Sequence, residues 1–147
     1  MESHLNQLFD YNFYCNKELI LQAKDVVDYP ESCKRLFSHI LNVHHLWNAA
    51  MLGEASEYTQ WQIHAIEDWE DIHYNNQRTT FGLLRNTEDL SKRINYTTEK
   101  GNTYTTEYKD VLFHIINHST HHRGQLLVEL RKHNVEPLEL EYIIYKR

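Results

Sequence analysis

The stretch with the most evident chemistry runs from Phe113 to Gln125 and carries four of the chain's eleven histidines within nine residues. It lies in the longest segment that can be read as one helix, from about Glu107 to His133. At about 100° per residue, His118 and His122 project from the same face, one turn apart. Two imidazoles at positions i and i+4 are close enough to bind one transition-metal ion. The pair therefore predicts two ligands of a metal site, with two core histidines as the alternative.

A third ligand must come from another element, because two histidines rarely hold zinc or nickel tightly. The second predicted helix, from about Glu31 to Leu52, offers His39, His44 and His45. His39 lies inside the apolar stripe of this helix, His44 at its margin, and His45 about 160° from its centre. An inward-facing histidine here can face the pair on the later helix, so His39 is the predicted third ligand. The alternative is a buried histidine bonded to a backbone carbonyl or a tyrosine.

Four segments with helical periodicity must position these residues, over about 3–25, 31–52, 63–86 and 107–133. Between the last two, Leu90 to Thr106 alternates at period two around Gly101 and Asn102, which predicts a β-hairpin. The fold class is therefore predicted to be all-α, a four-helix bundle with a small hairpin between its third and fourth helices. A single domain is expected to span residues 1–147.

Several side chains receive individual expectations from the same periodicity. Thr105 or Thr106 is expected to cap the fourth helix. His64 falls beside acidic residues of the third helix and is expected to be solvated, whereas His73 is expected to pack. The apolar-rich end, Leu138 to Tyr145, is expected to lie over the bundle or to meet a partner subunit.

Composition excludes several classes of function. The formal net charge is −6 with neutral histidines, and no run of lysine and arginine exceeds two residues, so nucleic-acid binding is not expected. No apolar stretch approaches the roughly 20 residues of a membrane span, and the N-terminus lacks the layout of a signal peptide. Cys15 and Cys33 are too few for a disulfide framework, which favours reduced thiols and a cytoplasmic location.

The sequence resembles the DinB-like family of metal-binding four-helix bundles, which is unrelated to the DNA polymerase of the same name. The resemblance extends over nearly the whole chain, and its most specific part is the string Asn-His-x-x-x-His-Arg-Gly-Gln. The matching segments are Asn117–Leu126, Ser38–Leu41 with Trp47, Phe9–Asn12, Gly101–Asn102 and Glu141–Tyr145.

This resemblance implies a ligand set of His39, His118 and His122, the same three residues chosen above by their facing direction. It also implies one divalent transition-metal ion per chain, with zinc or nickel favoured, and a homodimer. Within the signature string, Gly124 is expected to allow close helix contact. Arg123 is expected to pair with an acidic residue or a neighbouring chain, or else to be solvated.

Three imidazoles leave a coordination position open, at which a metal can activate water or a small thiol. Because relatives in the family include thiol-dependent transferases and isomerases, a metal-dependent S-transferase or hydrolase acting on a small molecule is expected. The alternatives are a stress-response protein that binds metal or ligand without turnover, and a dimeric structural bundle without metal. No general base is evident. By rough position the candidates are Asp68, His73, Glu107 and Tyr108, each with a structural role as the alternative.

Overall fold

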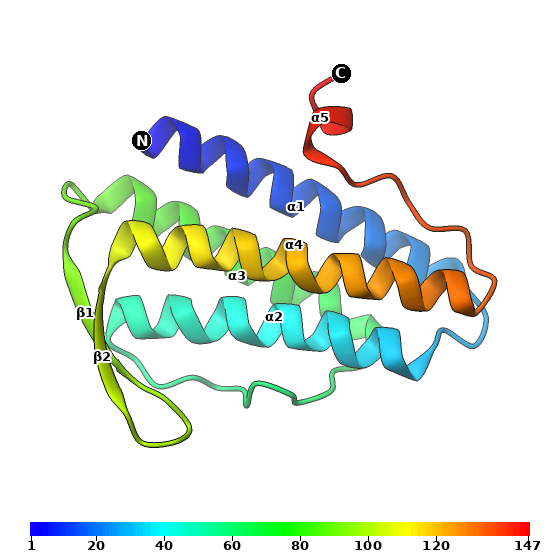
Figure 1. Cartoon of the computed structure of the whole chain (residues 1–147), viewed down its shortest axis with the longest axis horizontal. Coiled ribbons are helices and arrows are strands. Elements are labelled where there is room, and N and C mark those ends of the chain that lie inside the picture. The colour runs from blue at the N-terminus through cyan, green and yellow to red at the C-terminus, as the bar shows by residue number, and fades with distance from the viewer.

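The computed structural model describes residues 1–147, and most of them lie in four long helices that run side by side (Figure 1). The helices are α1 (Glu2–Asp25), α2 (Glu31–Leu52), α3 (Ile66–Asn86), α4 (Tyr108–Lys132) and the short α5 (Tyr142–Tyr145). Helix α1 packs against α3 and α4, and α2 packs against the same two helices. This arrangement is consistent with a four-helix bundle, and the predicted helical fold with one hairpin is confirmed.

Local sequence explains where α2 begins and ends. Helix α2 starts directly after Pro30, whose fixed φ suits the entry to a helix, and ends where Gly53 adopts the left-handed φ of 72°. Helix α3 starts at Ile66, three residues later than predicted. Residues Gly53–Ala65 therefore form a longer connector between α2 and α3, and this connector contributes to the site described below.

The predicted hairpin consists of β1 (Arg93–Thr97) and β2 (Thr103–Glu107). The strands are antiparallel, with Tyr96 opposite Tyr104, and Gly101 takes a φ of 86° in the turn. Strand β2 stays paired up to Glu107 and leads directly into α4. The expected threonine cap is therefore wrong: the cap residue is Glu107, and no side chain caps the helix.

The apolar core forms two clusters, and all four long helices contribute to both. One cluster centres on Trp69 and Phe37, whose ring centroids lie 4.4 Å apart, and includes Leu126 of α4. The other includes Phe9 of α1 and Leu112 of α4, nearer the hairpin. Because each cluster draws on every helix, burial of apolar surface fixes the relative positions of α2 and α4 along their length.

A buried polar network joins α2 to α3 between these clusters. The ring of His44 donates through Nε2 to Thr80 Oγ1 at 2.8 Å, and Thr80 donates to Asn48 Oδ1 at 2.9 Å. The side chain of Asn48 also donates to the backbone carbonyl of Asn76 on α3. The side chain of Asn76 donates in turn to the backbone carbonyl of Leu41 on α2. His44 is only 2 % exposed, so its expected place at the margin of the stripe is wrong: α3 covers it and supplies its partner.

Two other histidines test the expectations for the third helix. His64 is buried, and its ring bonds Asn42 Oδ1 at 2.6 Å, so its expected solvation is wrong. The reason is that His64 precedes α3 and belongs to the connector, which folds back on α2. His73 packs as expected, stacked on Phe13 with ring centroids 4.7 Å apart.

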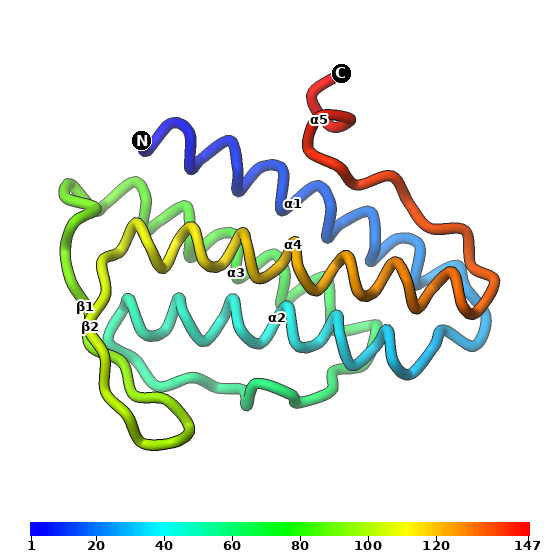
Figure 2. The backbone as a smooth tube through the Cα atoms, in the orientation of Figure 1, coloured from blue at the N-terminus to red at the C-terminus, as the bar shows by residue number.

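The C-terminal segment turns back after α4 and lies along α1, as the backbone trace shows (Figure 2). Gln22 donates to the carbonyl of Glu136, and Tyr11 donates to the carbonyl of Leu140, which is buried. The expectation that this segment covers the helices is thereby confirmed for the chain itself. None of the helices has both the length and the apolar character that crossing a membrane requires.

The buried histidines predict an acid-sensitive fold. Burial lowers the pKa of His44 to about 3 and that of His73 to about 4, against an ordinary value of 6.5. Below pH 6.5 the unfolded chain therefore binds protons that the folded chain does not, and stability falls with pH. For the two residues together we expect a loss of about 2 kcal/mol of unfolding free energy between pH 6.5 and 5.5. Urea titration of metal-free protein measures the total loss, to which the other histidines with lowered pKa also contribute.

A variant pair assigns this pH dependence to the buried rings. His44→Asn is expected to show a shallower slope than the wild type, whereas exchange of the exposed His4 for glutamine leaves the slope unchanged. An unfolding free energy that stays constant from pH 7 to pH 5 would contradict the assignment.

Candidate metal centre

Three histidine side chains converge between α2 and α4. His39 comes from the middle of α2, and His118 and His122 come from successive turns of α4. The Nε2 atoms of His39 and His118 lie 3.1 Å apart, and one ring nitrogen from each of the three residues lies within 4.8 Å of the others. These are the three residues that the sequence predicts, and the structure brings them together. They form the one group of three or more histidine, cysteine or acidic side chains in the chain that could hold a metal ion.

The outer nitrogen of two of these rings is held by an oxygen acceptor. His39 Nδ1 lies 2.8 Å from the carbonyl oxygen of Gln60, and His122 Nδ1 lies 2.8 Å from Oε1 of Gln125. Because these oxygens only accept, both Nδ1 atoms carry the proton, and in the neutral ring the Nε2 atom keeps its lone pair. Hydrogen bonds of this kind fix the tautomer and the orientation of histidines that bind metals.

Two planar groups, the indole of Trp61 and the guanidinium of Arg35, are stacked on the outer side of His39. The indole of Trp61 lies parallel to the imidazole, with ring centroids 3.6 Å apart and an interplanar angle of 5°. The guanidinium of Arg35 lies 4.0 Å from the centre of the Trp61 ring. Gln60 and Trp61 of the connector therefore hold His39 by one hydrogen bond and one stacking contact.

Burial keeps the three rings neutral at physiological pH. It lowers the pKa of His39 and of His122, and, with the neighbouring imidazoles of His122 and His39, it lowers the pKa of His118 to about 3. Histidine must be neutral to bind a metal ion, so the rings are already in the ligating form.

The donor set fits a borderline transition metal. Imidazole nitrogen suits zinc, nickel, copper and iron, whereas magnesium and calcium require oxygen. Two nitrogens that bind one tetrahedral ion at about 2.1 Å lie about 3.4 Å apart. The 3.1 Å between His39 and His118 is close to that separation, and it also allows His118 to donate to His39 when no ion is bound.

The other candidate residues do not join this cluster. His114 and His121 are exposed at its rim, with ring centroids 5.6 Å from His118 and 5.0 Å from His122 respectively. His45 points away, and its Nε2 accepts from the backbone nitrogen of Glu57.

Of the four residues considered as a general base, three bond other groups and the fourth is exposed. His73 bonds the carbonyl of Phe13, Tyr108 donates to the carbonyl of Met51, Glu107 pairs with Lys109, and Asp68 is exposed on α3. The structure therefore favours the structural alternative for His73, Tyr108 and Glu107.

Sequence reasoning missed three residues that orient the ligands. Gln60 and Trp61 lie in a connector without periodicity, and Gln125 belongs to the signature string but received no role. The one signal available was a tryptophan in a mostly polar connector. Tryptophan at such a position indicates a specific contact, although the sequence alone does not name the partner.

Removing the indole of Trp61 is expected to weaken metal binding. Outer contacts that orient a metal-binding histidine contribute about 10- to 100-fold to affinity, so we expect Trp61→Ala to lower the affinity about tenfold. Titration with a chromophoric chelator as competitor measures the change. Ile63→Ala removes an exposed apolar side chain from the same connector and is expected to bind as the wild type does. Equal affinities in the two variants would contradict the role given to Trp61.

Two comparisons with known proteins relate this chain to a family. The family model described as DinB family matches residues 24–147, which include all three histidines. The chain is also similar to Protein DinB of Bacillus subtilis (strain 168), with 24 % identity over 157 residues that cover 95 % of this chain and 91 % of the relative. The chain belongs to the DinB family.

Proposed function

We propose that the protein binds one divalent transition-metal ion through His39, His118 and His122 and uses it in chemistry on a small molecule. The observation that carries this proposal is the convergence of three neutral imidazoles, two of which have their outer nitrogen fixed by an oxygen acceptor. Zinc or nickel is the favoured ion, because both accept nitrogen ligands in this number.

A divalent metal bound by three imidazoles acts as a Lewis acid with a coordination position left for a small ligand. The chain's own residues would prepare that position. Gln60 and Gln125 hold the protons on Nδ1 of His39 and His122, so their inner nitrogens face the site. Trp61 covers one face of His39 and keeps water from that side of the ring.

Among metal-dependent reactions, we propose transfer of a low-molecular-weight thiol to an electrophile ahead of hydrolysis. Hydrolysis normally requires a general base near the metal, and none of the four candidate bases belongs to the cluster of three histidines. His73, Tyr108 and Glu107 bond other groups, and Asp68 is exposed on α3. A thiol needs no separate base, since coordination itself favours the thiolate. The lack of a general base beside the three histidines also supports a second candidate, a protein that binds metal or ligand without turnover.

A panel of reactions tests this proposal. Metal-loaded protein is incubated with small thiols and electrophilic acceptors, and in parallel with esters and amides, and the product is measured by mass spectrometry. We expect thiol-adduct formation that disappears with a chelator and in His118→Ala. Metal-dependent ester or amide cleavage without thiol transfer would contradict the preferred reaction, and metal binding without any turnover would support the second candidate.

The remaining proposals concern the context of the site. We propose that residues 1–147 act as a single four-helix-bundle domain, that the protein is a homodimer, and that it works in the cytoplasm. Light scattering coupled to gel filtration tests the dimer. The two cysteines, Cys15 and Cys33, are both free and buried, which fits a reducing compartment.

A further inference from the structure

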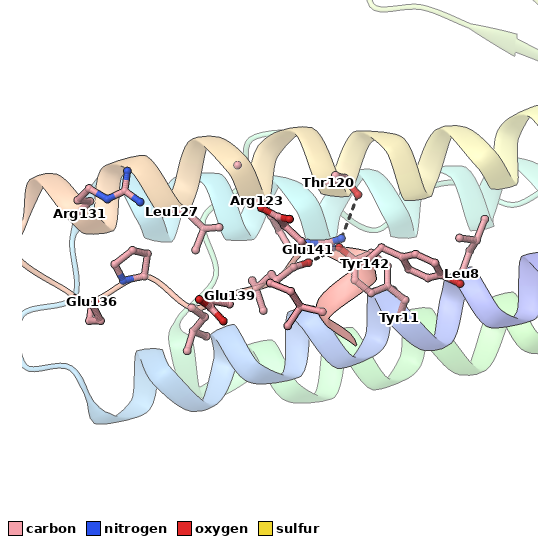
Figure 3. Close-up of a pocket in the computed structure, with 15 residues that line it drawn as sticks. Leu8, Tyr11, Thr120, Arg123, Leu127, Arg131, Glu136, Glu139, Glu141 and Tyr142 are labelled. Carbon is pink, nitrogen blue, oxygen red and sulfur yellow. Dashed lines mark hydrogen bonds between the residues drawn. The ribbon is translucent and has the colours of Figure 1, made fainter. Parts of the chain in front are cut away.

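A cavity lies on the side of α4 that faces away from the three histidines, between α1, α4 and the C-terminal segment (Figure 3). Its volume is about 710 Å³, within the range of small-molecule sites. Apolar side chains form much of its wall, among them Leu8, Leu127, Leu138 and Ile144. It includes none of the three clustered histidines.

The guanidinium of Arg123 contributes to the wall of this cavity and is almost completely buried, with 2 % of the residue exposed. It donates to Asn12 Oδ1 at 2.6 Å, to Asn16 Oδ1 at 3.0 Å and to Thr120 Oγ1 at 3.3 Å. None of the protein's four ion pairs includes Arg123. The expected acidic partner is therefore wrong within the chain, and so is the solvated alternative.

A buried cation without a carboxylate is uncommon, because removing a charge from water costs several kcal/mol unless an opposite charge offsets it. The partners of Arg123 are neutral oxygens, which satisfy hydrogen bonds but not charge. The amide nitrogens of Asn12 and Asn16 are also buried, and neither has a hydrogen-bond partner. Neither asparagine lines the cavity, so what remains unmet at its wall is the positive charge of Arg123, which no anion of the chain offsets.

Gly124, the next residue of α4, also borders the cavity. Glycine within a helix costs about 1 kcal/mol relative to alanine. The close helix contact expected at this residue is absent within the chain: a Cβ atom here would have nothing within 4 Å. The missing side chain instead leaves space in the cavity beside Arg123.

We propose that this cavity binds a small carboxylate with an apolar body. The carboxylate pairs with the guanidinium of Arg123, where a planar bidentate contact offsets the buried charge. The apolar body lies against the leucine side chains and over Gly124. The glutamates of the C-terminal segment, Glu136, Glu139 and Glu141, are exposed, so solvent screens their repulsion while Arg123 acts from a desolvated position.

The proposal is independent of the metal centre. Arg123 follows His122 directly, but its side chain bonds two residues of α1, whereas His122 lies against His39 of α2. Binding in the cavity is therefore expected in metal-free protein. Experiments with His118→Ala, treated with a chelator, exclude carboxylate binding to a metal ion.

The probe is 4-phenylbutyrate, compared with its neutral amide, 4-phenylbutyramide, by calorimetry or ligand-observed NMR. We expect the acid to bind at least tenfold more tightly than the amide. Gly124→Phe is expected to fill the cavity and weaken binding of the acid at least tenfold, while Gly124→Ala, which adds a single methyl group, is expected to weaken binding less. Because neither side chain meets another group at its Cβ, both variants are expected to fold.

The charge requirement is tested separately with Arg123→Gln, which is expected to lose the preference for acid over amide. Should that variant fail to fold, the two Gly124 variants and the comparison of acid with amide still decide whether the cavity binds a carboxylate. Equal binding of acid and amide by the wild type would overturn the proposal, as would unchanged binding in Gly124→Phe. Absence of binding together with a dimer that Gly124→Phe disrupts would assign the cavity to a second copy of the chain instead.

Discussion

Replacing His118 by alanine is expected to abolish stoichiometric metal binding and leave the helical fold intact. His118 contacts both other members of the cluster, with its Nε2 atom 3.1 Å from that of His39 and its ring centroid 4.4 Å from that of His122. Contacts that merely orient a ligand contribute up to about 100-fold to affinity, so loss of a ligand should exceed that. Elemental analysis of untagged protein measures the metal content, and circular dichroism measures the helices.

His121→Ala is the matched control, because it removes an exposed imidazole from the same helix at the rim of the cluster. It is expected to retain about one ion per chain, the stoichiometry that three convergent ligands predict. Full metal content in a variant that lacks both His118 and His122 would refute the site. Loss of metal in His121→Ala as well would indicate a different ligand set.

Replacing Thr80 by valine is expected to destabilise the fold by about 2–6 kcal/mol. The hydroxyl of Thr80 accepts from His44 and donates to Asn48 in a fully buried environment, and valine fills the same volume without it. Each buried polar group left without a partner costs about 1–3 kcal/mol, and this change leaves two. Urea unfolding at pH 7 measures the difference.

The neighbouring Thr79 provides a matched control on the same helix. It is half-buried, and its side chain bonds no other residue, so Thr79→Val is expected to change stability by less than about 0.5 kcal/mol. If the two valine variants were equally stable, the network between α2 and α3 would have no energetic role.

Periodicity in the sequence was sufficient to predict the three convergent histidines, because they lie on regular helices. An i, i+4 pair necessarily shares one face, and His39 lay in the apolar stripe of a helix whose end Gly53 marks. The hairpin was equally predictable from its alternation and its glycine-containing turn. In each case the local geometry of a single element determines which side chains point together.

The sequence did not predict features that depend on how the elements pack. His44 was placed at a margin, yet α3 covers it and Thr80 bonds it. The periodicity places His64 in a helix, but the helix begins two residues after it, so the predicted direction of the His64 side chain is wrong. An acidic partner is the expectation for Arg123, but the two asparagines that accept its hydrogen bonds lie more than 100 residues away in the chain.

The orienting contacts of the metal centre were missed for the same reason. Gln60 binds His39 through its backbone carbonyl, so the identity of its side chain carries no information about that role. Trp61 reaches His39 only because the connector folds back along α2. A segment without periodicity gives no prediction of its path, and these contacts became visible only with the fold.

An anomalous-difference map from crystals of the metal-loaded protein tests the metal centre most directly. The account predicts a single peak between α2 and α4, about 2.0–2.1 Å from one ring nitrogen of each of His39, His118 and His122. A map without a peak at this position, or with the ion held by other side chains while the three rings bond only one another, would contradict it.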